Sequence, residues 1–264
     1  MDPLLVALLS HSGYQLPLGS DEELLSALCR AFSRIPYENI TKILRVQGEL
    51  NQPHKESPEE LIGSFISHGT GGTCFPLTAT LTRLVRSLGF EAHPILADRR
   101  YGTDTHCALI LRKGSAAWQL LDPGYLIFTP CTIPSSGTLR YDLPLTPIEL
   151  VASPIPERVE LYTVAASPKG ELTRKLRLTY KVRPVDELEF TIAWDRSFGW
   201  EMMQYPILSS LVGNTHVYFQ KSALLLRTPS QSTREILTHE RMLDEITQRL
   251  GISRDIVKRA LSCL

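Results

Sequence analysis

The spacing of apolar residues predicts helices over the first third of the chain. Between Ser20 and Pro36, apolar side chains recur every three to four residues, the spacing that gathers them on one face of a helix. Ser20 with Glu23 three residues later predicts a capping box at the start of this helix, and Pro36 predicts its end. The same spacing predicts a second helix over residues 59–68 and a third over residues 77–88.

From about residue 90 the pattern changes to alternating or continuous apolar runs, which are typical of strands. Strands are predicted over residues 90–98, 107–112, 116–122, 159–164, 172–182, 187–192 and 216–228. Tight turns are predicted at residues 113–115 and 167–170, so the strands on either side of each turn pair as a hairpin. This order predicts an antiparallel sheet or barrel, followed by two short helices, one ending before Gly251 and one beginning after Ser253.

The composition indicates an ordinary globular protein without a global charge that would recruit nucleic acid or an anionic membrane. Apolar residues make up 43% and charged residues 21% of the 264 residues, and the 28 basic residues balance the 28 acidic ones. The apolar start of the chain carries Asp2 and no basic flank, which argues against a signal peptide. Neither a nucleic-acid partner nor a membrane partner is therefore predicted.

The five cysteines stand at positions 29, 74, 107, 131 and 263, an odd number with no CxxC pair among them. This usage argues against a disulfide framework and against a zinc site, and no metal site is predicted. Reduced thiols are typical of cytoplasmic proteins, so we expect a cytoplasmic location. Cys107 is interpreted as an ordinary buried thiol.

Cys74 lies in a stretch that suggests chemistry. The segment "HGTGGTCFP" (residues 68–76) places Gly71 and Gly72 just before this cysteine, where the third predicted helix opens. A helix N-terminus lowers the pKa of a thiol, and glycines let backbone N–H groups approach a substrate oxygen closely. Cys74 is therefore a candidate nucleophile; the alternative is a packed thiol beside a flexible loop.

A nucleophile needs a base and a group that orients the base, and His106 and Asp122 are the candidates. His106 stands just before the strand at 107–112, and Asp122 ends the strand at 116–122. A three-residue turn at 113–115 would pair the two directly, and a two-residue turn would shift the pairing by one position. Both turns bring the side chains to the same end of neighbouring strands, where directly opposed Cβ atoms lie about 4.5–5.5 Å apart. The alternatives are a structural histidine and an ordinary Asp-Pro-Gly turn.

Four stretches, in order, resemble motifs of the arylamine N-acetyltransferase family, a branch of the papain-like and transglutaminase-like cysteine enzymes. They are "RIPYENI" (residues 34–40), "GGTCF" (71–75), "THCALIL" (105–111) and "LLDPGY" (120–125). The opening "LLSHSGY" and the closing "ILTHERMLDEITQRLGIS" also follow the family pattern. The resemblance thus spans nearly the whole chain.

The resemblance implies an α+β fold with an N-terminal helical bundle, a central antiparallel β-barrel and a C-terminal α/β lid. The bundle with the nucleophilic cysteine is expected over residues 1–89, the barrel with the histidine and aspartate over 90–192, and the lid over 193–264. The implied reaction is ping-pong acyl transfer, in which a cysteine takes an acyl group from a thioester donor and passes it to a small amine. No tightly bound cofactor is implied; acyl-coenzyme A is the co-substrate.

The family's functional positions are matched residue by residue. Its catalytic positions correspond to Cys74 as the acylated nucleophile, His106 as the base and Asp122 as the orienting carboxylate. Its substrate-binding positions correspond to Tyr37, which lines the acceptor pocket, and to Thr105 and Gly124, which supply backbone contacts near the thioester.

The surroundings of the nucleophile depart from the family. Thr70 replaces an arginine, Pro76 a glutamate and Thr78 an asparagine, and the P-x-S-x-F segment appears only as "WDRSF" (residues 194–198). These departures leave open whether the acyl group arrives on coenzyme A or on an acyl carrier protein, and they predict room for acyl groups bulkier than acetyl. Two other functions stay open: a thiol amidase or cysteine peptidase-like hydrolase, and a catalytically silent binding homologue.

Overall fold

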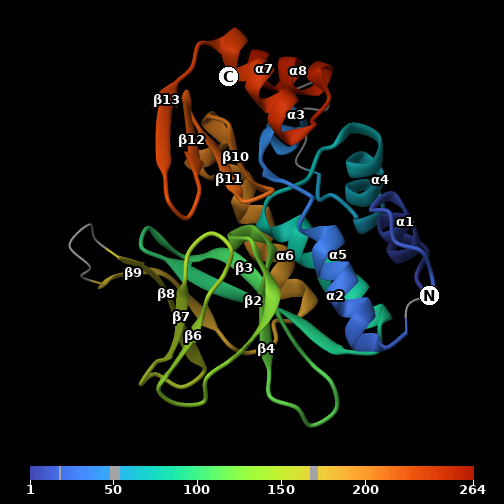
Figure 1. Cartoon of the computed structure of the whole chain (residues 1–264), viewed down its shortest axis with the longest axis vertical. Helices are drawn as coiled ribbons and strands as arrows, with labels where there is room; N and C mark the ends of the chain where they lie inside the picture. The colour runs from blue at the N-terminus through green and yellow to red at the C-terminus, as the bar shows by residue number, and fades with distance from the viewer. Residues whose placement is uncertain (18, 48–53, 167–171) are drawn as a thin grey trace.

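The computed structural model describes residues 1–17, 19–47, 54–166 and 172–264 and has an α+β fold (Figure 1). Its helices are α1 (Pro3–His11), α2 (Asp21–Phe32), α3 (Ile40–Gln47), α4 (Pro58–His68), α5 (Cys74–Ser87), α6 (Glu187–Arg196), α7 (His239–Leu250) and α8 (Arg254–Ser262). Three short 3₁₀ turns are η1 (Pro123–Tyr125), η2 (Ser197–Gly199) and η3 (Glu201–Gln204).

The N-terminal helices form where the sequence caps them and where their apolar faces can pack. Ser20 and Glu23 make the predicted capping box of α2, because each side chain accepts a hydrogen bond from the backbone N–H of the other. Leu28 and Phe32, one turn apart on α2, are fully buried in a core that also takes apolar side chains from α1, α4 and α5. The three predicted N-terminal helices are confirmed.

An antiparallel sheet of eight strands forms the centre of the described structure. Its strands are β2 (Glu91–Arg99), β3 (Gly102–Arg112), β4 (Gln119–Asp122), β5 (Ile127–Thr132), β6 (Thr138–Tyr141), β7 (Ile148–Ala152), β8 (Arg158–Ala166) and β9 (Leu172–Lys181). They are ordered β5-β4-β3-β2-β9-β8-β7-β6. The Tyr141 hydroxyl of edge strand β6 donates to the Thr132 carbonyl of edge strand β5 at 2.9 Å, so the sheet is nearly closed and the predicted barrel is confirmed.

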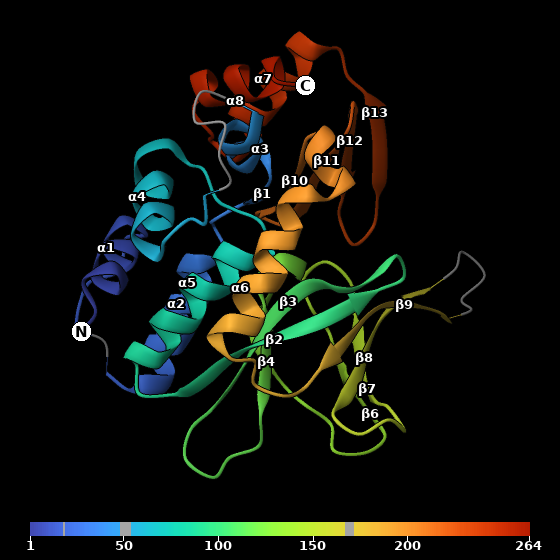
Figure 2. The same ribbon diagram turned by 180° about the vertical axis from the view of Figure 1, so that it is seen from behind.

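The strand β3 reads as a continuous apolar run because both of its faces are covered. Ala108 and Ile110 point into the barrel interior, whereas Cys107, Leu109 and Leu111 point toward the helical core. Helix α5 packs against β2 and β3 on that outer face, and the two views of the ribbon show it alongside them (Figures 1 and 2). A helix that opens at a cysteine is thereby held against the strand that carries His106.

A second sheet lies at the C-terminal end of the fold and joins both ends of the chain. It consists of β1 (Tyr37–Glu38), β10 (Ile207–Val212), β11 (Thr215–Gln220), β12 (Ala223–Arg227) and β13 (Ser232–Ile236), in that order. Apolar side chains from β10, β11 and β12 form a core with α3, α7 and α8, and Figure 1 shows these helices together beside the sheet. Pairing with β10 thus fixes the segment around Tyr37. The mixture of strands and helices expected in the C-terminal region is confirmed.

Two strand predictions were wrong. Residues 187–192 belong to α6, which Asp186 caps by accepting from the Glu189 N–H at 2.7 Å. Its buried residues, Phe190, Ala193 and Trp194, follow helical spacing, whereas the alternating Leu188 and Ile192 that suggested a strand are exposed. Residues 216–228 are not one strand but the hairpin β11–β12, which turns at Lys221 with a φ of 55°.

Three other expectations have different outcomes. The turn predicted at 167–170 lies outside the described residues, although the strands on either side of it, β8 and β9, pair antiparallel as expected. Within the described residues, no helix is both long and apolar enough to cross a membrane. The division of the chain at residues 89 and 192 stays a prediction.

Candidate active site

Cys74 is the first residue of α5, and its thiol is nearly enclosed. The residue is 2% exposed. Thr73 occupies the N-cap position without making a side-chain cap, and Pro76 has no N–H to offer. The first N–H groups of a helix lack intrahelical acceptors, so the amides of Cys74 and Phe75 stay free to receive an oxygen near the thiol.

The two glycines before Cys74 have a packing role, which corrects the expectation that their N–H groups approach a substrate oxygen. The Gly71 N–H donates to the Glu38 carboxylate at 3.3 Å, and the Gly72 N–H donates to the Pro36 carbonyl at 3.3 Å. A Cβ on Gly71 would lie 1.8 Å from the Pro36 carbonyl oxygen. Both N–H groups are therefore used, and glycine is required because the nucleophile turn passes so close to the segment before β1.

His106 and Asp122 meet in a fully buried hydrogen bond. The His106 Nε2 and the Asp122 Oδ2 are 2.7 Å apart, and both side chains are 0% exposed. Asp122 also accepts from the Tyr180 hydroxyl at 2.7 Å and from the Tyr125 N–H at 2.8 Å. A buried carboxylate needs such partners, and the three donors fix its orientation toward the imidazole.

The register that brings them together differs from the predicted one. Leu109 pairs with Leu121 and Leu111 with Gln119, so a partner of His106 at this register would be Gly124 rather than Asp122. The shift occurs because the chain stays irregular from residue 116 to 118 before β4 begins. The observed register lies two residues from the predicted direct pairing and one residue from the alternative. It keeps the imidazole and the carboxylate on the same face as diagonal neighbours, and their predicted contact is confirmed.

The thiol of Cys74 has a pKa well below its ordinary value of 9.0. A hydrogen bond with the Cys107 side chain lowers the pKa most, burial opposes this, and a hydrogen bond with His106 and the positive charges of His106 and Arg99 lower it further. Cys107 is buried as expected, but its thiol also lies 3.5 Å from the Thr78 hydroxyl, one turn along α5 from Cys74. The buried thiol of Cys107 thus also influences the pKa of Cys74.

The second nitrogen of His106 faces a cation that the sequence did not reveal. The Arg99 Nη2 lies 3.0 Å from the His106 Nδ1. Burial alone would lower the pKa of His106 and Arg99 lowers it too, but the charge of Asp122 and its hydrogen bond raise the pKa above 6.5 overall. An acidic thiol beside a basic imidazole is the arrangement of an activated nucleophile.

Gly124 lies beside Cys74 and His106, and its role toward substrate stays a prediction. A Cβ on Gly124 would be 2.8 Å from the His106 Cε1 and 2.9 Å from the Cys74 Cβ, so this glycine lies against both side chains. Tyr37 is 7% exposed, and a thiolate at Cys74 is close enough to raise the pKa of its hydroxyl, an effect second to burial. The Thr105 hydroxyl donates to the Gly102 carbonyl at 2.9 Å, and its role toward substrate stays a prediction.

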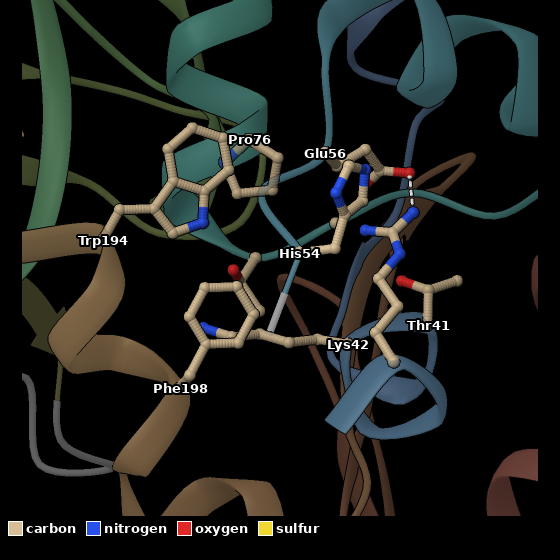
Figure 3. Close-up of a pocket in the computed structure, with 10 residues that line it drawn as sticks. Thr41, Lys42, His54, Glu56, Pro76, Trp194 and Phe198 are labelled. Atoms are coloured by element: carbon tan, nitrogen blue, oxygen red, sulfur yellow. Dashed lines mark hydrogen bonds and ion pairs between the residues drawn. The ribbon is translucent and has the colours of Figure 1, made fainter. Parts of the chain in front are cut away.

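The residues that depart from the family pattern lie beside the start of α5. Thr70 is 1% exposed, and its hydroxyl has no hydrogen-bond partner in the part of the chain that the structure describes. Pro76 lines a pocket with Trp194 and Phe198 on one side and Lys42, His54 and Glu56 on the other (Figure 3). Arg45 and Glu56 form an ion pair of 2.6 Å at the edge of this pocket.

Ser197 of the "WDRSF" segment holds a second buried cation. Its hydroxyl accepts from the Lys42 Nζ at 2.5 Å, and the ammonium lies 4.2 Å from the centre of the Phe198 ring. Burial lowers the pKa of Lys42 to about 8. Sequence analysis did not identify Lys42, Arg99 or Tyr180. The basic pair Arg99-Arg100, which directly follows a predicted strand, could have pointed to Arg99.

Comparison with known proteins identifies the fold. No protein-family model matches the sequence, and no curated protein is similar enough in sequence to be recognised as a relative. The structure of Mycobacterium marinum arylamine N-acetyltransferase in complex with CoA matches with a TM-score of 0.80 at 13% identity, covering 97% of this chain and 98% of that chain. Arylamine N-acetyltransferase from Salmonella typhimurium matches with a TM-score of 0.79 at 15% identity, over 100% of both chains.

A third match is described with a glutamate in its catalytic triad. An arylamine N-acetyltransferase from Bacillus cereus, described as having a Cys-His-Glu catalytic triad, gives a TM-score of 0.75 at 18% identity over 96% of this chain and 100% of that chain. At these identities the likeness shows the fold. The chain has the arylamine N-acetyltransferase fold, as the sequence motifs led us to expect.

Replacing Gly71 by alanine should destabilise the protein, because the added methyl group would collide with the Pro36 carbonyl. Overpacking of this kind costs about 1–3 kcal/mol. Gly63→Ala is the matched control. Gly63 lies in α4, a Cβ there meets no atom within 4 Å, and alanine should raise the free energy of unfolding by about 0.5–1 kcal/mol. Urea denaturation measures both. Equal stability of the two variants would contradict the packing role of Gly71.

Replacing Gly124 by alanine should displace Cys74 and His106 relative to each other, because the added methyl group would collide with both. Misplacing reacting groups by about 1 Å can cost roughly 10²-fold in rate. We expect the rate of Cys74 modification by iodoacetamide to fall by about that factor, with Gly63→Ala unchanged. A Gly124→Ala protein that is folded and reacts at the wild-type rate would show that Cys74 and His106 do not act together.

Proposed function

We propose that this chain is an N-acyltransferase: Cys74 takes an acyl group from a coenzyme A thioester and passes it to a small-molecule amine. The observation that carries this proposal is the buried His106–Asp122 pair beside a thiol at a helix N-terminus, in a fold shared over nearly its full length with arylamine N-acetyltransferases. In this proposal the three residues act as nucleophile, base and orienting carboxylate.

In the first half-reaction the Cys74 sulfur forms a bond to the thioester carbonyl carbon. Its proton passes to His106 Nδ1, and the resulting imidazolium is stabilised through Nε2 by Asp122. Collapse of the tetrahedral intermediate breaks the bond to the donor sulfur, which leaves as a thiol with the proton from His106. The acyl group then resides on Cys74.

In the second half-reaction an amine nitrogen attacks the Cys74 thioester. His106 accepts a proton from the amine and returns a proton to the departing Cys74 sulfur, so the enzyme is regenerated and an amide is released. Both tetrahedral intermediates carry a negative oxygen. The free amides of Cys74 and Phe75 at the start of α5 are the donors suited to that oxygen, since the glycine amides are already bonded.

The fold shared with acyltransferases favours transfer over hydrolysis. Cys74 is 2% exposed and His106 0%, so both reactions require the site to open. The thiol chemistry described above also argues against a silent homologue, because a pKa well below the ordinary value has no use in a packing role. Hydrolysis and silence remain the outcomes against which the proposal is tested.

The donor is proposed to be an acyl-coenzyme A. The coenzyme A complex of the Mycobacterium marinum enzyme favours coenzyme A over a carrier protein, since it shares this fold over 97% of the chain. Thr70 and Pro76 stand beside the start of α5 in place of charged residues, and we propose that acyl groups larger than acetyl are accepted. Tyr37, Thr105 and Gly124 are the residues proposed to contact the substrate.

Intact-protein mass spectrometry tests the function with acetyl-, butyryl- and benzoyl-coenzyme A. We expect Cys74 to gain one acyl group and to lose it rapidly only when an aromatic amine is added. Asp122→Asn should slow the acylation by about 10⁴-fold, as in the analogous serine triad, because an amide can hold the wrong imidazole tautomer. Loss of the acyl group in buffer alone would indicate a hydrolase, and a protein that no donor acylates would contradict the proposal.

A further inference from the structure

Arg99 is a half-buried cation without a carboxylate partner in the described part of the chain. It ends β2, and its Nε atom is buried without a hydrogen-bond partner among the described residues. Its remaining nitrogens make two contacts, at 3.0 Å each: Nη1 with the Tyr101 hydroxyl and Nη2 with the His106 Nδ1. Neither partner carries a negative charge that would compensate a guanidinium removed from water.

The acidic residues nearest in sequence are already paired. Arg158 and Lys181 bind Asp98 at 3.1 and 3.2 Å, and Lys181 also binds Asp104. Asp122 is on the far side of the imidazole, where it bonds to His106 and Tyr180. Within the described residues no carboxylate is therefore paired with Arg99, although its charge interacts with the thiolate form of Cys74.

Arg99 also extends from the catalytic base to the surface. One end of its guanidinium meets His106, which is 0% exposed, and the other meets Tyr101, which is 71% exposed. A substrate that reaches the nearly enclosed thiol of Cys74 requires side chains to move. A long arginine side chain at the end of a strand can move with little change to the backbone.

The contact with His106 has a chemical consequence. A guanidinium only donates hydrogen bonds, so Arg99 occupies the lone pair of Nδ1, the nitrogen that must accept the thiol proton. Once Nδ1 is protonated, two N–H groups would face each other. Proton transfer from Cys74 therefore breaks the contact between Arg99 and Nδ1, and an anion from the substrate would favour this step by giving Arg99 another acceptor.

We propose that Arg99 is a specificity residue that binds a carboxylate of the substrate and, in doing so, frees Nδ1 of His106 for Cys74. The carboxylate belongs to the acyl chain of the thioester or to the amine acceptor. That this carboxylate belongs to an acyl-transfer substrate rests on the function proposed above. The preference for anions near Cys74 is independent of that function.

The first test is alkylation of Cys74, which needs no acyl transfer. Iodoacetate carries a carboxylate where iodoacetamide carries a neutral amide. Peptide mapping gives the alkylation rate of each reagent at Cys74 and, as an internal reference, at the partly exposed Cys263. We expect the iodoacetate-to-iodoacetamide rate ratio at Cys74 to exceed that at Cys263 by about 10-fold or more. In Arg99→Gln the ratio at Cys74 should fall to the reference value, and in Arg99→Lys it should be partly retained.

Arg100→Gln is the matched control. Arg100 is the exposed neighbour of Arg99, and this substitution removes the same charge from the surface. It should keep the wild-type ratio at Cys74, and circular dichroism checks that each variant is folded. A ratio that is the same in wild type and Arg99→Gln would overturn the proposal, as would an equal fall in Arg100→Gln, which would reflect only the overall field.

The second test distinguishes the two sources of the carboxylate. Acylation of Cys74 by malonyl-coenzyme A is compared with acetyl-coenzyme A, and transfer to 4-aminobenzoate is compared with transfer to 4-aminobenzamide. One of these preferences should favour the anion in wild type and be lost in Arg99→Gln, which assigns the carboxylate to the acyl chain or to the acceptor. Absence of both preferences would refute a substrate role for Arg99. If no donor acylates the protein, the proposed function fails while the alkylation ratio still reports on Arg99.

Discussion

The buried hydrogen bond between His106 and Asp122 is the constraint on which the rest of the structure depends. Both side chains are inaccessible to water, and removing one partner of such a buried pair typically costs about 3–5 kcal/mol. The pair is tolerated because Asp122 takes three donors, including the Tyr180 hydroxyl from across the barrel. The same pair gives the imidazole the basicity that a buried thiol needs from it.

Three separate parts of the chain converge on this pair. Helix α5 brings the thiol, β3 and β4 bring the imidazole and carboxylate, and the C-terminal strand β10 holds β1, whose Tyr37 bridges to Gly72 in the nucleophile turn. The close approach of Gly71 to the Pro36 carbonyl fixes the position of the turn before Cys74. Two cations lie near the site: Arg99 contacts His106, and Lys42 lies in the pocket lined by Pro76. The hydrogen bond with Cys107 contributes most to the low pKa of the Cys74 thiol, and the charge of Arg99 lowers it further.

The sequence predicted the features that depend on local pattern. Helix α2 follows from its capping box and its apolar face. Five of the eight strands of the barrel, β2, β3, β4, β8 and β9, follow from alternating or continuous apolar runs, whereas β5, β6 and β7 were not predicted. The contact of His106 with Asp122 was also predictable, although the register was two residues off, since an error of two keeps both side chains on one face. An error of one residue would have placed them on opposite faces.

Features that depend on distant parts of the chain were not predictable. Residues 187–192 alternate like a strand, but Phe190 and Trp194 pack against Phe75 of α5, and this tertiary contact selects the helix. The glycine pair before Cys74 suggested an oxyanion site, because nothing in the sequence shows that the segment at Pro36 passes beside it. Arg99 and Tyr180 reach the site through sheet geometry alone, so no motif identified them.

Ultraviolet absorbance of the Cys74 thiolate tests the account most directly. The difference spectrum between wild type and Cys74→Ser, followed as the pH is lowered from 9, reports the charge on this one sulfur. We predict that the thiolate persists well below the ordinary pKa of 9.0 and that Asp122→Asn moves its loss to higher pH, because the imidazolium that stabilises it is weakened. A thiolate that disappears near pH 9 in wild type, unchanged by Asp122→Asn, would contradict an activated Cys74 and with it the proposed acyl transfer.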